Sequence, residues 1–499
     1  MRFLEKVIAI LLVVSVFPWV TSASAVLKGD MNGDGKILVS DAKMVLLLAS
    51  DCKNITKKQK SIADMDGDGV ITTNDASAVL RLCADLNPTD FLGKVKQITP
   101  NQKHASSVKS RFCRVKSHCA ETLPDTSTVN RSNPLYTPLL KGTFDYVTSG
   151  PVKDSSSGKE FYYLKSGRRV YKQDVAVFKG YNMPDNKIKL ENLAACSDSS
   201  TSVYLKLDWR VPFNVTIKPQ EYFTGYDSRP FNIKDGEFTG SYMDVVFYYT
   251  TEATGKPQIA QSDVVKSFKW LENADNQTTT LRIYFKDAGK FYGYTAYYDD
   301  NNYLVISIKE SADSLNGKVI EIDPGHGGAQ PGAGSGTGVY ERDITYKIAL
   351  QLKKLLESSG ATVVFSRDDS SSVPEIEERR INTIKNNPDM LISIHLDAAS
   401  SKSVSGSSAF YYKSYSGPLA KAISKNLPTA VKNGTGYAMN NRGYFFYPFC
   451  VTRVENCPSV LVECGFITNT GDFKIQNSAK GQKSIAKGIY NGILEYCEI

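Results

Sequence analysis

The feature that most limits the possible folds is an alternation of apolar runs and amphipathic stretches after residue 313. Strands are predicted at 319–323, 361–366, 390–395 and 459–464, and helices at 341–357, 374–387, 416–427 and 478–497. Strands that alternate with helices favour a parallel sheet, because neighbouring parallel strands need long crossover connections. We therefore expect an α/β domain over residues 313–499, with a largely parallel sheet covered by helices.

The turn after the first of these strands carries a histidine among glycines. The sequence reads VIEIDPGHGG from Val319 to Gly328, and Pro324 and Gly325 end the strand abruptly. In open α/β sheets, ligands bind beyond the carboxyl ends of the strands, which is where His326 would lie. A single histidine in a glycine-rich turn is more often an ordinary turn residue than a catalytic one, so the interpretation needs further residues.

Three later residues supply that support. Glu341 follows a glycine-rich loop and opens a predicted helix, and His395 ends a predicted strand. Glu463 lies within the apolar run 458–466, where a carboxylate is costly unless it has a partner. Two histidines and one glutamate form a known ligand set for catalytic zinc. A second glutamate that is not a ligand can then act as the base.

The chain resembles the zinc-dependent N-acetylmuramoyl-L-alanine amidases, which cut peptidoglycan. The family pattern is a strand followed by DPGHGG, then G-x-x-E, a strand ending in SIH, and VE-x-GF. The matching segments are Asp323–Gly328, Gly338–Glu341, Ser393–His395 and Val462–Phe466. The resemblance covers about residues 316–499, and four elements in the family's order make it specific.

This resemblance implies a reaction and a role for each site residue. His326, Glu341 and His395 would bind Zn²⁺, and Glu463 would be the catalytic acid/base. The bond cleaved would be the amide between N-acetylmuramic acid and L-alanine. Two other functions stay open from the sequence: a zinc peptidase that cuts within the stem peptide, and an inactive wall-binding or assembly protein. The complete set of four residues weighs against the inactive protein.

One further segment of this domain differs from the pattern, and one arginine has an undecided role. After the second histidine the family usually has Ala-Asn-Ala, whereas this chain has Leu396, Asp397 and Ala398. This difference concerns the shape of the cleft and leaves the metal ligands unchanged. Arg379 aligns with an arginine of the family pattern. It would either orient substrate or form a salt bridge on the helix surface.

An internal repeat occupies the beginning of the chain. GDMNGDGKILVSDAKMVLLL and ADMDGDGVITTNDASAVLRL match each other 34 residues apart, and each contains a twelve-residue calcium loop. Oxygen ligands at alternating positions suit Ca²⁺ rather than a softer metal. The predicted ligands are Asp30, Asn32, Asp34, Lys36 through its carbonyl, and Asp41 in the first loop, and Asp64, Asp66, Asp68, Val70 through its carbonyl, and Asp75 in the second.

The repeat over residues 26–88 is similar to a type I dockerin, a small α-helical module with two Ca²⁺ ions. Position 12 of each loop is aspartate rather than glutamate, and the first loop has no room for an entering helix. The resemblance implies docking onto a cohesin domain of a scaffoldin, through positions 10 and 11 of each loop, which are residues 39–40 and 73–74. A calcium sensor or a purely structural calcium clamp is the alternative.

Residues 1–25 are predicted to be a cleaved signal peptide. A charged start, an apolar stretch and the small-residue site Ala23–Ala25 follow one another in the order of secretory signals. The alternative, an uncleaved anchor, is disfavoured because the apolar stretch is short and ends at Pro18. We therefore expect a secreted protein, extracellular or associated with a cell surface, without an integral membrane segment after cleavage.

The middle of the chain is predicted to contain a linker and a β-rich domain. Residues 89–140 are rich in Pro, Ser, Thr and Asn and show little periodicity. Within them Cys113, His118 and Cys119 suggest a zinc site, although a local disulfide or free thiols fit the spacing better. Residues 141–312 alternate apolar and polar side chains, which predicts a sandwich or curled sheet. This domain is weakly similar to the wall-targeting domains that precede such amidases.

Charge and cysteine content add little to these predictions. The net charge of +8 is spread along the chain, so it is compatible with anionic wall polymers but does not argue for nucleic acid. All nine cysteines lie beyond the signal peptide. Export permits disulfides, and Cys450 and Cys457 could form one, whereas Cys464 fits a small core residue.

Overall fold

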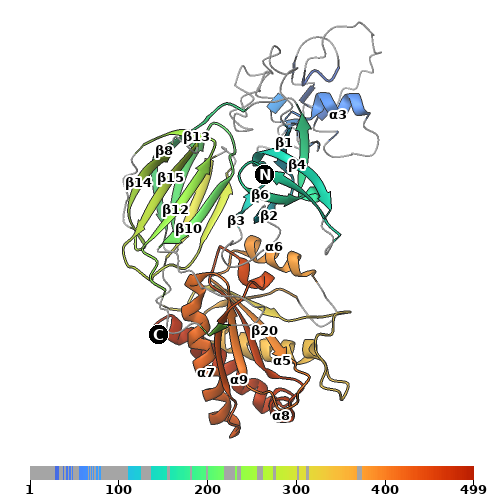
Figure 1. Ribbon diagram of the computed structural model, residues 1–499, viewed down its shortest axis with the longest axis vertical. Helices are drawn as coiled ribbons and strands as arrows, with labels where there is room; N and C mark the ends of the chain where they lie inside the picture. Colours follow the sequence, from blue (N-terminus) through green and yellow to red (C-terminus); the bar gives the residue numbers. More distant parts are fainter. Residues whose placement is uncertain are drawn as a thin grey trace, which may run out of the picture. The chain divides into compact units, whose positions relative to one another are not determined.

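The chain forms two compact units, residues 1–97 with 300–302 and residues 98–299 with 303–499, in the computed structural model (Figure 1). Each unit is described by itself. The predicted signal peptide lies outside the described residues. The structure describes residues 28–32, 37–38, 41–42, 44–45, 48, 56–65, 67, 69, 71, 75–76, 78–79, 111–124, 136–153, 158–179, 183–197, 200–218, 231–232, 238–255, 262–273, 277–299, 303–310, 314–367 and 374–499.

The first unit has a small core to which both sequence repeats contribute. Met31 and Val45 from the first repeat pack with Ile62, Ile71 and Val79 around the second. Helix α3 (Lys57–Ala63) precedes the second loop and begins with a reciprocal capping box between Thr56 and Gln59. A core this small supplies limited stability on its own.

A seven-stranded antiparallel sheet begins the second unit, in the order β3-β2-β6-β5-β4-β1-β7. The prediction of a linker over residues 89–140 is therefore wrong for residues 111–124 and 136–140, since β1 to β3 belong to this sheet. These strands are short, and their partners are distant in sequence, as β1 pairs with β4 and β7. The elements are β1 (Arg111–Val115), β2 (Cys119–Pro124), β3 (Tyr136–Leu140), β4 (Phe144–Lys153), β5 (Glu160–Leu164), β6 (Arg168–Tyr171), η3 (Lys172–Asp174) and β7 (Val175–Lys179).

The next part of the chain, from β8 onward, is a β-sandwich. A sandwich is one of the two arrangements predicted for residues 141–312, but β4 to β7, which lie in that range, belong to the preceding sheet. One sheet of the sandwich has the order β10-β12-β15-β14 and the other β13-β8-β9-β17-β16, with one apolar core that contains Val203, Leu281 and Ile306. The strands are β8 (Asn186–Ser197), β9 (Ser200–Leu207), β10 (Phe213–Lys218), β12 (Tyr242–Tyr248), β13 (Thr250–Thr254), β14 (Val265–Asn273), β15 (Thr278–Phe285), β16 (Tyr294–Tyr298) and β17 (Tyr303–Lys309). Strand β11 (Phe231–Asn232) belongs instead to the sheet of the C-terminal domain.

The C-terminal domain is an α/β domain whose sheet has the order β11-β22-β21-β23-β20-β18-β19. Helix α5 begins and ends at the predicted residues. The elements are β18 (Val319–Pro324), α5 (Glu341–Glu357), β19 (Thr362–Phe365), α6 (Ile376–Asn386), β20 (Met390–Asp397), β21 (Ser407–Tyr411), η5 (Ser414–Ser416), α7 (Gly417–Thr435), β22 (Asn441–Phe446), η6 (Cys450–Arg453), β23 (Ser459–Phe466), α8 (Thr470–Gln476) and α9 (Ala479–Tyr496).

This sheet is mixed, which corrects the prediction of a largely parallel one. Strands β19, β18, β20 and β23 are parallel to their neighbours, but β21 pairs antiparallel with β23. The connection from Asp397 to Ser407 is too short for a helical crossover, so β21 cannot run parallel to the strand before it. Strands β21 and β22 were not predicted.

The two faces of the four parallel strands differ in composition. One face packs its apolar side chains against α5, α7 and α9 in a single large core that includes Ile322, Ile394 and Val462. The side chains between these positions point to the other face, because successive residues of a strand alternate. That face holds a second, smaller core next to α6 and η6. It also carries Glu321, Asp323, Ser393, His395 and Glu463.

Glu321 is a fully buried carboxyl group on this second face. It accepts hydrogen bonds from Thr383 Oγ1 (2.8 Å) and Asn386 Nδ2 (3.2 Å) of α6. Burial raises its pKa from 4.5 to about 7, although both hydrogen bonds act in the opposite direction. Folded chains therefore keep the proton at a pH where unfolded chains lose it. The stability of the domain should fall as the pH rises from about 4.5 to about 7.

Glu321→Gln should remove this pH dependence, because glutamine has the shape of the protonated acid and no charge. The variant should be more stable than the parent at pH 8, by up to about 3 kcal/mol, and the difference should shrink at pH 5. Urea unfolding at both pH values measures the effect. Glu357→Gln, an exposed change at the end of α5, is the control. An equal difference at pH 5 and pH 8 would contradict the prediction.

Six cysteines are free thiols: Cys113, Cys119, Cys450, Cys457, Cys464 and Cys497. Of the two alternatives left open for Cys113 and Cys119 the structure has the free thiols, and the disulfide allowed between Cys450 and Cys457 is not formed. Burial raises the pKa of Cys119 and Cys457 to about 12, so both behave as small core residues. Within the part of the chain that the structure describes, no helix has both the length and the apolar character needed to cross a membrane.

Candidate active site

The candidate site is built around the turn that follows β18. His326 has a φ of 60°, in the left-handed region that residues other than glycine rarely adopt, and Gly327 and Gly328 also have positive φ values. Gly325 is required for a different reason: a Cβ atom there would lie 2.5 Å from the ring of His395. The glycine-rich turn thus lets the backbone approach the second histidine closely.

Three predicted metal ligands converge at this turn. His326 Nε2 lies 3.1 Å from Oε2 of Glu341, and His395 Nδ1 lies 2.9 Å from Oε1 of the same carboxylate. One potential ligand atom from each of the three residues lies within 4.8 Å of the others. Among the described residues this is the one such cluster found. The cluster therefore has the donor types and the spacing of a zinc site.

Glu341 is held in place by the backbone. It is the first residue of α5 and is buried, and its two oxygens accept hydrogen bonds from the amides of Leu396 (3.0 Å) and Ala333 (2.9 Å). Burial alone would raise its pKa, but the hydrogen bonds from His326 and His395 lower the pKa well below its ordinary value. A carboxylate that stays ionised and oriented is suited to bind a cation.

Glu463 lies next to this cluster on β23, where it is the cross-strand neighbour of His395. Its Oε2 atom is buried and has no hydrogen-bonding partner among the described residues. Burial raises its pKa well above the ordinary value, and the charges of Asp397 and Glu341 raise it further. An acid with a buried oxygen that has no partner among the described residues is unusual in a structural role and common at reacting centres.

One cavity joins these residues. It has a volume of about 450 Å³ and contains the three predicted ligands together with Glu463. Leu396 and Asp397, the two residues that depart from the family pattern, also line it. Burial raises the pKa of Asp397. The cavity therefore presents several carboxyl groups to whatever occupies it.

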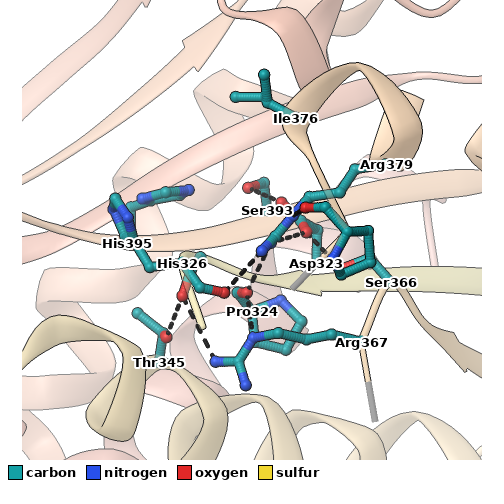
Figure 2. Close-up of polar contacts among 12 residues, drawn as sticks. Asp323, Pro324, His326, Thr345, Ser366, Arg367, Ile376, Arg379, Ser393 and His395 are labelled. Carbon is teal, nitrogen blue, oxygen red and sulfur yellow. Dashed lines mark hydrogen bonds and ion pairs between the residues drawn. The ribbon is translucent and has the colours of Figure 1, made fainter. Parts of the chain in front are cut away.

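A buried polar network that the sequence did not predict lies beneath the turn (Figure 2). Arg379 of α6, which is 6% exposed, donates to Asp323 Oδ1 at 2.8 Å. Asp323 also accepts from Ser393 Oγ at 2.6 Å and from Ser366. The suggested salt bridge of Arg379 on the helix surface is wrong, because the pair is buried. The pattern of residues along a helix does not by itself tell a buried arginine from an exposed one.

Of the predicted calcium ligands, Asp30, Asn32, Asp41, Asp64 and Asp75 lie within the described residues. Asp41 and Asp75, at position 12, are fully buried and accept backbone amide hydrogen bonds from their own loops. Asp64 Oδ2 accepts the amide of Gly69, while its Oδ1 is buried without a partner among the described residues. The predicted ligands Asp34, Lys36, Asp66, Asp68 and Val70 lie outside the described residues.

The residues Cys113, His118 and Cys119 do not form a second metal cluster among the residues that the structure describes. Cys113 and Cys119 are buried in the small β-sheet module, whereas His118 is exposed. The zinc alternative for these residues is therefore not supported.

Two parts of the chain match families of known proteins. Residues 320–495 match a family model for N-acetylmuramoyl-L-alanine amidase, and residues 28–82 match one for the dockerin type I domain. A germination-specific N-acetylmuramoyl-L-alanine amidase of Bacillus subtilis (strain 168) is 33% identical over 197 residues, which cover 36% of this chain and 81% of the relative.

Two further similar proteins are a relative from a staphylococcus and a solved structure. A probable cell wall amidase, LytH, of Staphylococcus epidermidis is 31% identical over 211 residues, which cover 42% of this chain and 68% of the relative. The crystal structure of an N-acetylmuramoyl-L-alanine amidase from Clostridium difficile 630 has 31% identity and a TM-score of 0.34, covering 37% of this chain and 98% of that chain.

Proposed function

Because this chain belongs to the N-acetylmuramoyl-L-alanine amidase family and carries a type I dockerin domain, we propose that it is a secreted, scaffold-attached peptidoglycan hydrolase. It cleaves the amide bond between N-acetylmuramic acid and L-alanine. The observation that carries this function is the cluster of His326, Glu341 and His395 in one cavity with Glu463, whose Oε2 atom has no partner among the described residues.

The three clustered residues fit a zinc ion. Their donor set is two imidazoles and one carboxylate, which leaves one coordination position for water or substrate. Zinc bound there would polarise the scissile carbonyl and make a water molecule more acidic. The backbone amides that hold Glu341 keep the carboxylate in one orientation, as partners of metal ligands commonly do.

Glu463 performs the proton transfers. Its carboxylate takes a proton from the water whose oxygen attacks the lactyl carbonyl carbon, and it returns the proton to the nitrogen of L-alanine as the C–N bond breaks. Without this proton the leaving group would be a strongly basic amide anion. The burial that raises the pKa of Glu463 favours its protonated form, which makes the acid competent as the proton donor.

Digestion of purified peptidoglycan separates this function from its alternatives. The full chain should release new amino termini on L-alanine, identified by mass spectrometry of the soluble products. New termini within the stem peptide would instead show a zinc peptidase. Binding to the wall without any new terminus would show an inactive wall-binding protein.

The dockerin domain anchors the enzyme to a cohesin of a scaffoldin and binds two calcium ions. Oδ1 of Asp64, which is buried without a partner among the described residues, and the buried aspartates at position 12 support calcium binding. Export through the signal peptide predicted at residues 1–25 would deliver the enzyme to the cell exterior. Binding to a matched panel of cohesins tests the partner, and failure with every member would count against it.

Calcium should stabilise the first unit strongly, since a module as short as residues 26–88 can bury only a limited core. Saturating calcium should raise the melting temperature of that unit by at least about 10 °C relative to chelator. Calorimetry of the full chain measures this shift, because the melting temperatures of the other transitions should not change. Magnesium at the same concentration is the control. If the melting temperature of the first unit did not change with calcium, the assignment of the two loops as calcium sites would be refuted.

A further inference from the structure

His326 is held in a backbone conformation that its own sequence does not favour. A φ of 60° places its backbone in the left-handed region, where an L-residue other than glycine is strained. Such a conformation persists only where neighbouring groups impose it. The residues that impose it therefore also determine where the imidazole lies.

Arg379 provides the most extensive set of these contacts (Figure 2). Its Nη2 donates to the carbonyl of His326 at 2.7 Å, and its Nη1 donates to the carbonyl of Pro324 at 3.1 Å and to Asp323 Oδ1 at 2.8 Å. Its Nε donates to the carbonyl of Pro374 at 3.2 Å. One guanidinium thus joins the end of β18 and the histidine turn to the start of α6.

Two other residues also donate hydrogen bonds to carbonyls of this turn. Thr345 Oγ1 donates to the carbonyl of Gly325 at 3.0 Å, and Arg367 Nε donates to that of Pro324 at 2.9 Å (Figure 2). Only Arg379, among these three residues, has a hydrogen bond to the carbonyl of His326 itself. Asp323, held by Ser393 and Ser366, in turn fixes the guanidinium.

We propose that Arg379, fixed by Asp323, is a positioning residue that holds the strained backbone of His326 and thereby sets the affinity of the site for zinc. This inference rests on the proposed function. It differs from substrate orientation, because four of the arginine's N–H···O contacts go to the protein itself. A guanidinium has five N–H donors, so little capacity is left for a ligand.

Arg380 offers a matched control on the same helix. It is buried to a similar degree, but its Nε donates to Glu377 at 3.2 Å. Removing its charge should therefore cost stability while leaving the histidine turn intact. A comparison of the two adjacent arginines separates positioning of His326 from general destabilisation of the domain.

The test measures the zinc dissociation constant of the full chain by competition with a chromogenic chelator, together with kcat and KM on soluble peptidoglycan fragments. Arg379→Gln should weaken zinc binding by about 10–100-fold, as loss of a group that orients a metal ligand does. Its kcat should fall with little change in KM. Arg379→Lys should recover part of the affinity, since an ammonium keeps the charge but cannot reach every acceptor. Arg380→Gln should change zinc affinity less than about threefold.

Asp323→Asn keeps the proposal testable if Arg379→Gln does not fold, and it should weaken zinc binding in the same direction. Parental zinc affinity in a folded Arg379→Gln or Asp323→Asn chain would overturn the proposal, as would equal losses in the Arg379 and Arg380 variants. A raised KM with unchanged zinc affinity would assign Arg379 to substrate binding instead. In each of these cases the parent still binds zinc and releases L-alanine termini, so the proposed function stands. If the parent neither bound zinc nor released L-alanine termini, the proposal about Arg379 and the proposed function would both be overturned.

Discussion

Glu463→Gln is expected to slow peptidoglycan hydrolysis by about 10²–10⁴-fold while zinc content and melting temperature stay close to those of the parent. Glutamine keeps the size and hydrogen-bonding capacity of the side chain but cannot accept a proton near neutral pH. Oε2 of Glu463 has no partner among the described residues, so its replacement breaks no hydrogen bond of the described structure. Rates at saturating substrate, with zinc analysis of the same samples, measure the effect.

Asp397→Asn is the matched control for this variant, because Asp397 lines the same cavity and is also a carboxyl group. It should keep most of the activity. If Glu463→Gln cleaved normally and Asp397→Asn did not, Asp397 would be the proton-transferring group. Loss of zinc from Glu463→Gln would instead make Glu463 a metal ligand. A rise in KM alone would indicate a role in binding.

His326→Ala and His395→Ala are each expected to remove both zinc and hydrolysis. The parent should carry about one zinc per chain, held by three protein ligands. Loss of one ligand should weaken binding by more than the 10–100-fold typical of losing an outer-shell partner. Metal analysis after dialysis, together with the peptidoglycan assay, measures both quantities.

The same measurement on His118→Ala provides the control, since His118 is an exposed histidine outside the cavity. Its zinc content and activity should equal those of the parent. Stoichiometric zinc in His326→Ala or His395→Ala would mean that the ligand assignment is wrong. Zinc retained with activity lost would instead place that histidine in the reaction rather than in the metal site.

The four candidate site residues could be named from sequence because each lies within a short local pattern. His326 follows a strand in a glycine-rich turn, Glu341 opens a helix, His395 ends a strand, and Glu463 interrupts an apolar run. Parallel strands bring their carboxyl ends to one edge, so His326 and His395 were expected to lie close together. The structure places all four residues around one cavity.

Strand pairing between distant segments was less predictable. The polar composition of residues 89–140 predicts a linker, yet β1, which lies in that range, is completed by β4 and β7. The antiparallel β21 was missed because its partner β23 lies far along the chain. A strand is stabilised mainly by its pairing and packing with such partners, and a local window of sequence does not contain them.

By itself, the sequence determined the alternation of elements in the C-terminal domain, the repeat of the calcium loops, and the residues able to bind metal, because these depend on local periodicity and on side-chain chemistry. Only the tertiary structure decided how those residues are supported. It buried Arg379 against Asp323 and the carbonyl of His326, and it left Oε2 of Glu463 without a partner among the described residues. Burial and hydrogen bonding arise from contacts between segments far apart in the chain, so they exist only once the sheet and α6 have come together.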